Sequence, residues 1–270
     1  MEHKLLEAIK GVDDKVDDKD ETKSFKGKWV SILGDSISTY EGWIPSDNAT
    51  FYPKQDVTDV TKTWWHQLLT RLGAKLCVNQ SWSGRRVSDE KSVNSAVRNA
   101  VNKLHRETGK SYINLDDTTE VATKRQDPDI ILIMLGINDF NNDVPLGELC
   151  CNNSPSYDST NFSKSYETML MDIIGRNYPL AKVYCLNIAY SSSHCEFLMP
   201  NNASNKLIEY RKAIEEAAKE YECNVIHLDR IGITAANIEQ FTEDKLHPGL
   251  KFMIMIANQC YNEMMASNCL

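Results

Sequence analysis

Five short apolar runs alternate with longer amphipathic stretches along most of this 270-residue chain, and this alternation restricts the fold more than any other feature. The apolar runs lie near residues 28–33, 75–79, 130–135, 182–187 and 224–229. The amphipathic stretches, with apolar residues at helical spacings, are residues 63–72, 91–106, 162–176, 204–221 and 249–266. Because apolar strands that are each followed by a helix are typical of a parallel sheet covered on both faces, we expect an α/β fold.

The composition fits a single domain with a substantial core, since 41% of the residues are hydrophobic. A net charge of −8 and an isoelectric point near 5.3 argue against nucleic acid or an anionic membrane surface as a partner. The most apolar run, residues 130–135, is far shorter than the roughly 20 residues that span a bilayer. The N-terminus has no apolar signal-peptide core and the cysteines form no C-x-x-C pair, so we expect a cytoplasmic protein unless a signal peptide has been removed.

Residues 1–27 differ from the rest of the chain because Asp, Glu and Lys dominate their composition. Four apolar residues in this segment recur at alternating four- and three-residue steps, as on one face of a helix: Leu5, Ile9, Val12 and Val16. We therefore expect a charged helical extension before one domain at residues 28–270. Two interpretations stay open, since so short a helix is marginal alone: it docks or joins copies into a homo-oligomer, or it is a solvated tail.

Polar residues and glycines follow the first three predicted strands at the point where each strand ends. Ser36 follows the first strand, Gly84 the second and Asn138 the third. Because functional groups gather at the carboxyl ends of parallel strands, we expect these three residues to lie close together.

Ser36 is the candidate nucleophile, and a serine hydroxyl attacks only when a base takes its proton. His247 is the candidate base, since Pro248 suits the first turn of a helix and would place His247 at the cap of the last one. Asp244, three residues earlier, can reach the other imidazole nitrogen and fix its tautomer. The three residues would then form a catalytic triad.

A hydrolytic triad also needs hydrogen-bond donors for the oxygen that becomes negative in the transition state. The candidates for this oxyanion hole are the N–H groups of Ser36 and Gly84 and the side-chain amide of Asn138. Asn79 can brace the second block, and Asp139 can hold the Asn138 turn through a local hydrogen bond.

Each block has an ordinary explanation when taken alone, because Gly and Asp are common in turns. Asp244 and His247 could also bind a metal, but two ligands with no further cluster do not make a site, so we expect none. The chain lacks the glycine-rich motifs of nucleotide-binding loops. It is the occurrence of all the blocks in one chain that favours catalysis.

The blocks LGDSIS, NQSWSG, LGIND and DKLHP, in this order, resemble those of the SGNH hydrolases, also called the GDSL esterase and lipase family. The namesake residues would be Ser36, Gly84, Asn138 and His247, with Asp244 as the triad acid. The resemblance covers roughly residues 28–266. It implies a flavodoxin-like three-layer α/β/α sandwich with a five-stranded parallel sheet, and neither a metal nor a cofactor. The first block departs slightly, with GDSIS where GDSLT or GDSIT is commoner.

Two long polar segments, residues 40–62 and 140–160, are expected to form walls of the substrate pocket, and a third, 107–127, has no predicted role. The aromatic residues that we place at the pocket are Trp43, Phe51 and Tyr52, together with Trp64 and Trp65, which could equally belong to the core. Aromatic rings among polar residues suit a sugar, so the expected activity is hydrolysis of short acyl esters such as O-acetyl groups on carbohydrates. The alternatives are a lysophospholipase or thioesterase and, in another class, an inactive glycan-binding module.

Overall fold

The computed structural model describes residues 25–88, 94–149, 156–189 and 200–267. Its centre is a sheet of five parallel strands in the order β2-β1-β5-β6-β7. The strands are β1 (Trp29–Gly34), β2 (Lys75–Asn79), β5 (Ile130–Met134), β6 (Lys182–Leu186) and β7 (Asn224–Ile226). They correspond to the five predicted strands, and the α/β prediction is confirmed.

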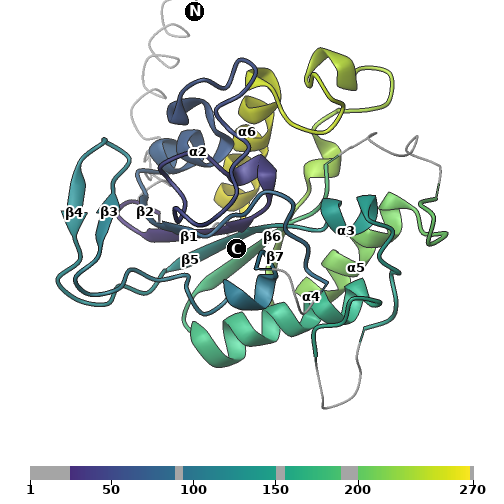
Figure 1. Cartoon of the computed structure of the whole chain (residues 1–270), viewed down its shortest axis with the longest axis horizontal. Helices are drawn as coiled ribbons and strands as arrows, with labels where there is room; N and C mark the ends of the chain where they lie inside the picture. The colour runs from purple at the N-terminus through teal and green to yellow at the C-terminus, as the bar shows by residue number, and fades with distance from the viewer. Residues whose placement is uncertain (1–24, 89–93, 150–155, 190–199, 268–270) are drawn as a thin grey trace, which may run out of the picture.

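Helices cover both faces of this sheet and complete a three-layer sandwich (Figure 1). Helices α2 (Trp64–Leu72) and α6 (Leu250–Ala266) pack against each other on one face. Helices α4 (Phe162–Leu170) and α5 (Leu207–Glu220) pack together on the other, and α4 continues as a π-helix over Met171–Asn177. The short helix α3 (Ile137–Asn141) follows β5. Short 3₁₀ turns cover Ser36–Ser38, Val60–Lys62, Val97–Asn99, Leu228–Arg230 and Ile238–Gln240.

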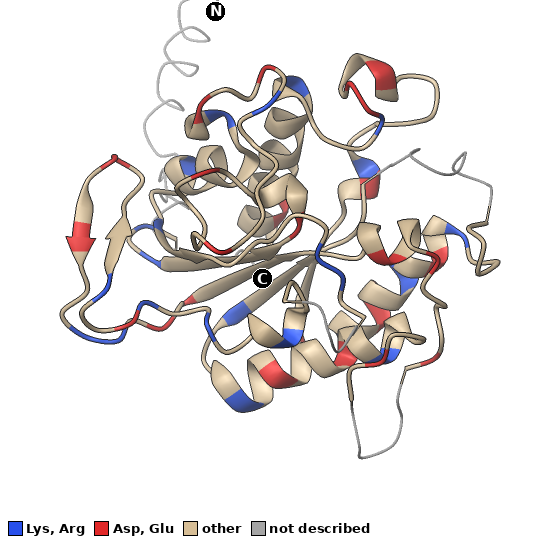
Figure 2. Ribbon diagram, in the orientation of Figure 1, with Lys and Arg blue, Asp and Glu red and all other residues tan. Residues whose placement is uncertain are grey.

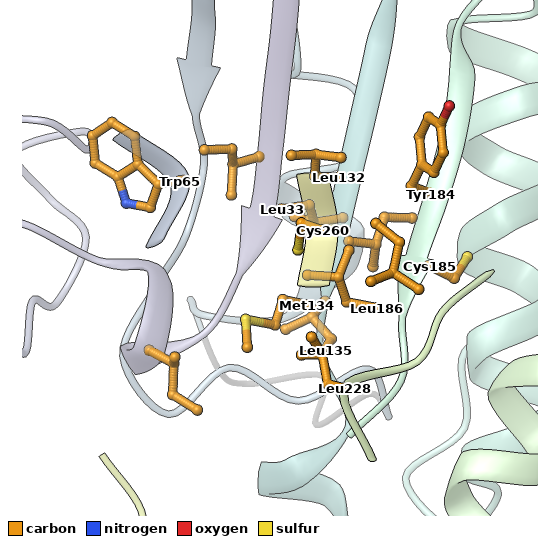
Figure 3. Packing of buried hydrophobic residues seen from close by; sticks show 14 of the residues in the cluster. Leu33, Trp65, Leu132, Met134, Leu135, Tyr184, Cys185, Leu186, Leu228 and Cys260 are labelled. Atoms are coloured by element: carbon orange, nitrogen blue, oxygen red, sulfur yellow. The ribbon is translucent and has the colours of Figure 1, made fainter. Parts of the chain in front are cut away.

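The strands supply most of the core. All five residues of β5 are buried, and Figure 3 shows side chains of β1, β5 and β6 packed with Trp65 of α2 and Cys260 of α6. Lys and Arg, like Asp and Glu, lie mainly on helices and loops with the two signs interspersed, whereas the sheet is almost free of them (Figure 2). A sheet buried on both faces explains why its strands read as continuous apolar runs.

The predicted helix at residues 91–106 is wrong for its described part, residues 94–106, which holds only the 3₁₀ turn Val97–Asn99 and further turns. The residues that suggested a helix, among them Val97, Val101 and Leu104, are nevertheless buried. Valine and asparagine are weak helix formers, and successive turns bury the same apolar residues. Contacts with the sheet therefore determine the local structure: the Leu104 carbonyl accepts a hydrogen bond from the Ser31 hydroxyl at 2.7 Å.

The N-terminal extension lies outside the described residues up to position 24, so its predicted helix and its role in assembly stay predictions. Phe25 is 2% exposed and belongs to the core. Two residues later, the Gly27 N–H donates a hydrogen bond to the Gly73 carbonyl at 2.8 Å. The globular unit therefore includes the last residues that we assigned to the extension.

Arg106 joins the edge of the sheet to the insertion at residues 107–127, which forms an antiparallel hairpin of β3 (Ser111–Ile113) and β4 (Thr119–Val121). Its buried guanidinium donates to the carbonyls of Leu76 and Cys77 in β2, at 2.8 and 3.0 Å, and to Asn114 beyond β3, at 2.9 Å. The side chain thus satisfies backbone groups on β2, an edge strand that pairs only with β1 among the described strands.

We expect Arg106→Met to lower the free energy of unfolding by about 2–4 kcal/mol, because it leaves the Leu76 and Cys77 carbonyls without their charged donor. Urea denaturation measures the change. Arg125→Met is the matched control, since the Arg125 side chain is 53% exposed and forms an ion pair with the exposed carboxylate of Asp127. Equal stability of the two variants would contradict the role of Arg106.

Candidate active site

The turn after β1 holds Ser36 in a buried, tightly constrained position. The Asp35 carboxylate accepts the Ile37 N–H at 3.0 Å and caps the 3₁₀ turn that begins at Ser36. Gly34 is required just before it, because a Cβ there would lie 2.6 Å from the Ser38 hydroxyl oxygen. The turn thus fixes the direction in which the Ser36 hydroxyl points.

Three side chains hold this turn through Ser38. Trp65 and Asn79 donate to the Ser38 carbonyl at 3.1 and 2.8 Å, and Trp64 donates to the Ser38 hydroxyl at 3.2 Å. Both tryptophans are fully buried, so they belong to the core and the pocket-wall alternative is wrong for them. Asn79 braces the second block as predicted, since its carbonyl oxygen also accepts the Ser81 N–H at 3.0 Å.

Ser36, His247 and Asp244 meet, although 211 positions separate the serine from the histidine. His247 Nε2 lies 2.9 Å from Ser36 Oγ, and His247 Nδ1 lies 2.6 Å from Asp244 Oδ2. The other carboxylate oxygen of Asp244 accepts the backbone N–H groups of Leu246 and His247 at 3.0 and 2.7 Å. Asp244 therefore orients both the ring and the loop that carries it.

The electrostatics of this loop keep the carboxylate charged and the imidazole neutral near pH 7. Burial raises the pKa of Asp244, but the hydrogen bonds from His247 and Leu246 outweigh it and leave that pKa below its usual value. Burial lowers the pKa of His247, Asp244 opposes this, and the Lys54 charge adds to the lowering. A neutral imidazole can accept a proton from a hydroxyl.

His247 does not cap the last helix, contrary to the sequence prediction. The cap of α6 is Gly249, and Pro248 precedes it. The Asp56 carboxylate accepts the Leu250 N–H at 2.7 Å, so a residue from a distant loop satisfies the first turn of α6. His247 thus lies on the loop before the helix, where its Nε2 is within hydrogen-bond distance of Ser36 Oγ.

A clamp formed by residues 51–56 holds the His247 loop, and sequence reasoning missed most of it. The Phe51 ring stacks on the imidazole, with centroids 3.5 Å apart and planes 10° from parallel. Lys54 Nζ lies 4.4 Å from the centroid of the same Phe51 ring. The Tyr52 hydroxyl donates to the Pro248 carbonyl at 2.7 Å. Stacking by Phe51 fixes the plane of the imidazole, and the contacts of Tyr52 and Asp56 fix the position of the backbone after it.

The aromatic residues predicted at the pocket therefore separate into different places. Phe51 lies against His247, and its backbone N–H donates to Thr39 beside the Ser36 turn at 2.9 Å. Tyr52 is fully buried, so it cannot line a substrate pocket, and the prediction for it is corrected. Trp43 lines a separate cleft at the edge of the sheet. The composition of the loop could not distinguish these positions, because only the fold decides which ring faces inward.

Gly84 and Asn138 approach one another through Arg85. Gly84 has φ +81°, a backbone conformation that favours glycine. The Asn138 amide donates one hydrogen to the Arg85 carbonyl at 3.0 Å, which orients the amide and leaves its second hydrogen available. Among the described residues, the backbone N–H groups of Ser36 and Gly84 donate to no protein acceptor.

Asp139 ties the second and third blocks together, where we predicted a local bond. Its two carboxylate oxygens accept the N–H groups of Val87 and Ser88 at 3.0 and 2.9 Å, about 50 positions away in the sequence. The residue is fully buried. Since Asn138 is its neighbour, this link also fixes the position of the Asn138 amide relative to Gly84.

Asp35, which precedes Ser36 in the sequence, carries a buried carboxyl group. It is 1% exposed, and its Oδ2 has no hydrogen-bond partner in the described structure. Burial raises its pKa to about 7, against which the Ile37 N–H acts, while Asp139 raises it further. Arg85, itself buried, supplies a compensating charge.

Within the described part of the chain, no group of three or more His, Cys, Asp or Glu side chains could hold a metal ion. No helix among the described residues is both long and apolar enough to cross a membrane. The Asp244 carboxylate and the His247 imidazole are engaged with each other and with Ser36.

The chain belongs to the GDSL-like lipase/acylhydrolase family, whose family model matches residues 28–264. The expected resemblance is thereby confirmed, and the chain is an esterase or acylhydrolase by family. No curated protein matches it.

Solved structures share the fold. A protein described as a GDSL-like lipase from Bacteroides ovatus has 26% sequence identity and a TM-score of 0.63, over 89% of this chain and 99% of that one. A similar protein from Bacteroides uniformis has 24% identity and a TM-score of 0.61, over 87% and 94%. An acetylxylan esterase from Geobacillus stearothermophilus has 17% identity and a TM-score of 0.51, over 89% and 95%. At this identity the last two show the fold alone.

We expect Lys54→Gln to raise the pKa of His247, because it removes a positive charge that disfavours the imidazolium. NMR titration of the imidazole resonances measures the shift, with His247→Gln used to assign the signal. Lys54→Arg keeps the charge and is the control. An unchanged titration in Lys54→Gln would show that the Lys54 charge does not reach the ring.

Proposed function

We propose that this protein is a serine esterase that cleaves carboxylic esters through an acyl-enzyme on Ser36. The proposed substrates are esters of short acyl groups, such as O-acetyl groups on carbohydrates. The observation that carries the proposal is the continuous hydrogen-bonded chain from Asp244 through His247 to the Ser36 hydroxyl, with distances of 2.6 and 2.9 Å. The family supplies the reaction class, that of esterases and acylhydrolases.

In the first half of the proposed reaction, Ser36 Oγ attacks the ester carbonyl carbon and His247 Nε2 takes the hydroxyl proton. The carbonyl oxygen becomes an oxyanion, which the Ser36 and Gly84 N–H groups and the free Asn138 amide hydrogen stabilise. The carbon–oxygen bond to the alcohol then breaks, and His247 returns the proton to the leaving alcohol. Asp244 keeps its charge throughout and stabilises the imidazolium.

In the second half, a water molecule attacks the acyl-enzyme while His247 takes one of its protons. The second tetrahedral intermediate breaks its bond to Ser36 Oγ, and the proton passes from His247 to that oxygen. The products are a carboxylic acid and the original serine. The reaction consumes only the ester and one water molecule and involves no redox step.

In this mechanism Phe51 and Lys54 are positioning residues for the base. The stacked Phe51 ring prevents the imidazole from rotating out of line with Ser36. The Lys54 charge keeps the ring neutral at lower pH, which extends the range over which it can act as a base. Tyr52 and Asp56 hold the loop itself.

The preference for a short acyl group is supported by the acetylxylan esterase with the same fold, which acts on acetyl esters. The polar loop at residues 40–62, with the aromatic side chain of Trp43, agrees with a carbohydrate substrate. A small cavity of about 20 Å³ lies next to the Ser36 turn, lined by Asp35, Ile37 and Pro248 with residues of β5, β6 and α6. Ser36 and His247 do not line this cavity, so the acyl group is not assigned to it.

We expect Ser36→Ala to reduce turnover of p-nitrophenyl acetate by at least about 10⁴-fold, because no other group can carry the acyl intermediate. Circular dichroism should remain that of the wild type, since the change removes one oxygen from a supported turn. A fluorophosphonate probe should label the wild type at Ser36 and leave Ser36→Ala unlabelled. Retained hydrolysis in Ser36→Ala would end the assignment.

We also expect kcat/KM to fall as the acyl chain lengthens from acetyl to butyryl to palmitoyl in p-nitrophenyl esters. A preference for acetyl esters predicts that the loss arises in acylation. Faster cleavage of palmitoyl esters would favour a lysophospholipase, and faster cleavage of acyl-CoA a thioesterase. An inactive glycan-binding module, the alternative from another class, predicts no hydrolysis and no fluorophosphonate label in the wild type.

A further inference from the structure

A second cavity lies at the edge of the sheet, between β2, the hairpin strand β3 and the segment Gly42–Ser46. Figure 1 shows the β3–β4 hairpin standing beyond β2 at this edge. We call this cavity the edge cleft. Its volume is about 470 Å³, within the range of small-molecule sites in proteins. The insertion at residues 107–127, which had no predicted role, forms one of its walls.

Two half-buried aromatic side chains line the edge cleft from different segments, Trp43 and Tyr112. Trp43 is supported by Trp65 and His66, with ring centroids 5.8 and 5.9 Å away. The Tyr112 hydroxyl accepts the Glu107 N–H at 2.7 Å, and the Arg106 guanidinium lies 5.0 Å from the centre of its ring. Both rings are therefore held in fixed positions before any ligand arrives, which lowers the entropy lost on binding.

The polar groups of the edge cleft carry almost no net charge. Lys110 Nζ lies 2.7 Å from a carboxylate oxygen of Glu107, so the two charges compensate. Burial and the nearby Arg125 charge lower the pKa of His105, which leaves this ring neutral near pH 7. Gln80 adds a neutral amide. A ligand with strong charge would find no counter-charge here, whereas a neutral polyhydroxyl ligand would find aromatic faces and hydrogen-bonding groups together.

The edge cleft is physically linked to the proposed active site. Asn79 lines it and also donates to Ser38 in the nucleophile turn. The N–H of its neighbour Gln80 donates to the Ile32 carbonyl, four residues before Ser36. At strand spacings, four residues and one step between strands amount to at most roughly 13 and 5 Å, a separation that a few sugar units can span.

We propose that the edge cleft binds a neutral oligosaccharide and so recognises the glycan part of an acetylated carbohydrate. Its contribution to hydrolysis rests on the proposed function, but the binding itself does not require catalysis. Trp43 and Tyr112 provide the stacking surfaces, and Gln80, His105 and the Glu107–Lys110 pair provide hydrogen bonds to hydroxyl groups.

The test is a calorimetric titration of the whole chain with unacetylated xylotetraose and cellotetraose. We expect saturable binding of at least one of them by the wild type and by Ser36→Ala. Trp43→Ala should weaken it about tenfold, because one stacking face is lost. Ser46→Trp is the second variant: Ser46 is exposed at the cleft, so the new ring should block it without disturbing the packing behind Trp43.

Tyr261→Ala is the matched control, since Tyr261 is a half-buried aromatic residue on α6 in contact with Arg71 and away from the edge cleft. Its affinity should equal that of the wild type. The ratio of kcat/KM for an acetylated oligosaccharide to that for p-nitrophenyl acetate should fall about tenfold in both cleft variants. The proposal is overturned if the wild type shows no saturable binding, or if both cleft variants bind as tightly as the wild type. If the wild type does not hydrolyse p-nitrophenyl acetate, only the proposed function is contradicted.

Discussion

The parallel pairing of β1 with β2 on one side and with β5 on the other is the constraint on which the rest of the molecule depends. It brings the ends of three strands, and with them the segments that carry Ser36, Gly84 and Asn138, to one edge of the sheet although these residues are far apart in the sequence. The two contacts that join the blocks, Asn79 to Ser38 and Asp139 to Val87 and Ser88, then fix their mutual positions. The sheet and these two contacts therefore position the segments of Ser36, Gly84 and Asn138.

The fourth group, His247, comes from the other end of the chain and needs separate support. It receives this support from the segment 51–56, through stacking by Phe51, the Tyr52 hydroxyl and the Asp56 carboxylate. The same loop, continuing back to Trp43, reaches the edge cleft. One connection between β1 and α2 therefore links the proposed base, the Ser36 turn and the proposed glycan site.

Much of this arrangement could be predicted from the sequence, for reasons that differ between elements. The five strands were predictable because burial on both faces gives continuous apolar runs such as that of Ile130–Met134. The meeting of Ser36, Asp244 and His247 followed from residue chemistry and from the order of the blocks. The turns that replace the predicted helix at residues 94–106 were not predictable, since they bury Val97, Val101 and Leu104 as well as a helix would. Likewise, no local pattern distinguishes Tyr52 in the core from Phe51 on the imidazole, and the place of Lys54 depends wholly on the folded loop.

The buried carboxyl group of Asp35 makes the folding stability depend on pH in the direction opposite to the proposed chemistry of His247. Its pKa is about 7 in the folded chain and 3.8 in a solvated one, so the folded state binds more protons between these values. Folding stability therefore decreases as the pH rises from about 4 to about 7, and above that range the ionised side chain leaves the stability at its lower value. The neutral imidazole that the proposed chemistry requires becomes more populated in the same direction, because the pKa of His247 lies below its ordinary value. A rise in pH thus favours the proposed chemistry at His247 while the ionisation of Asp35 lowers the folding stability, so the two side chains place opposite demands on the pH.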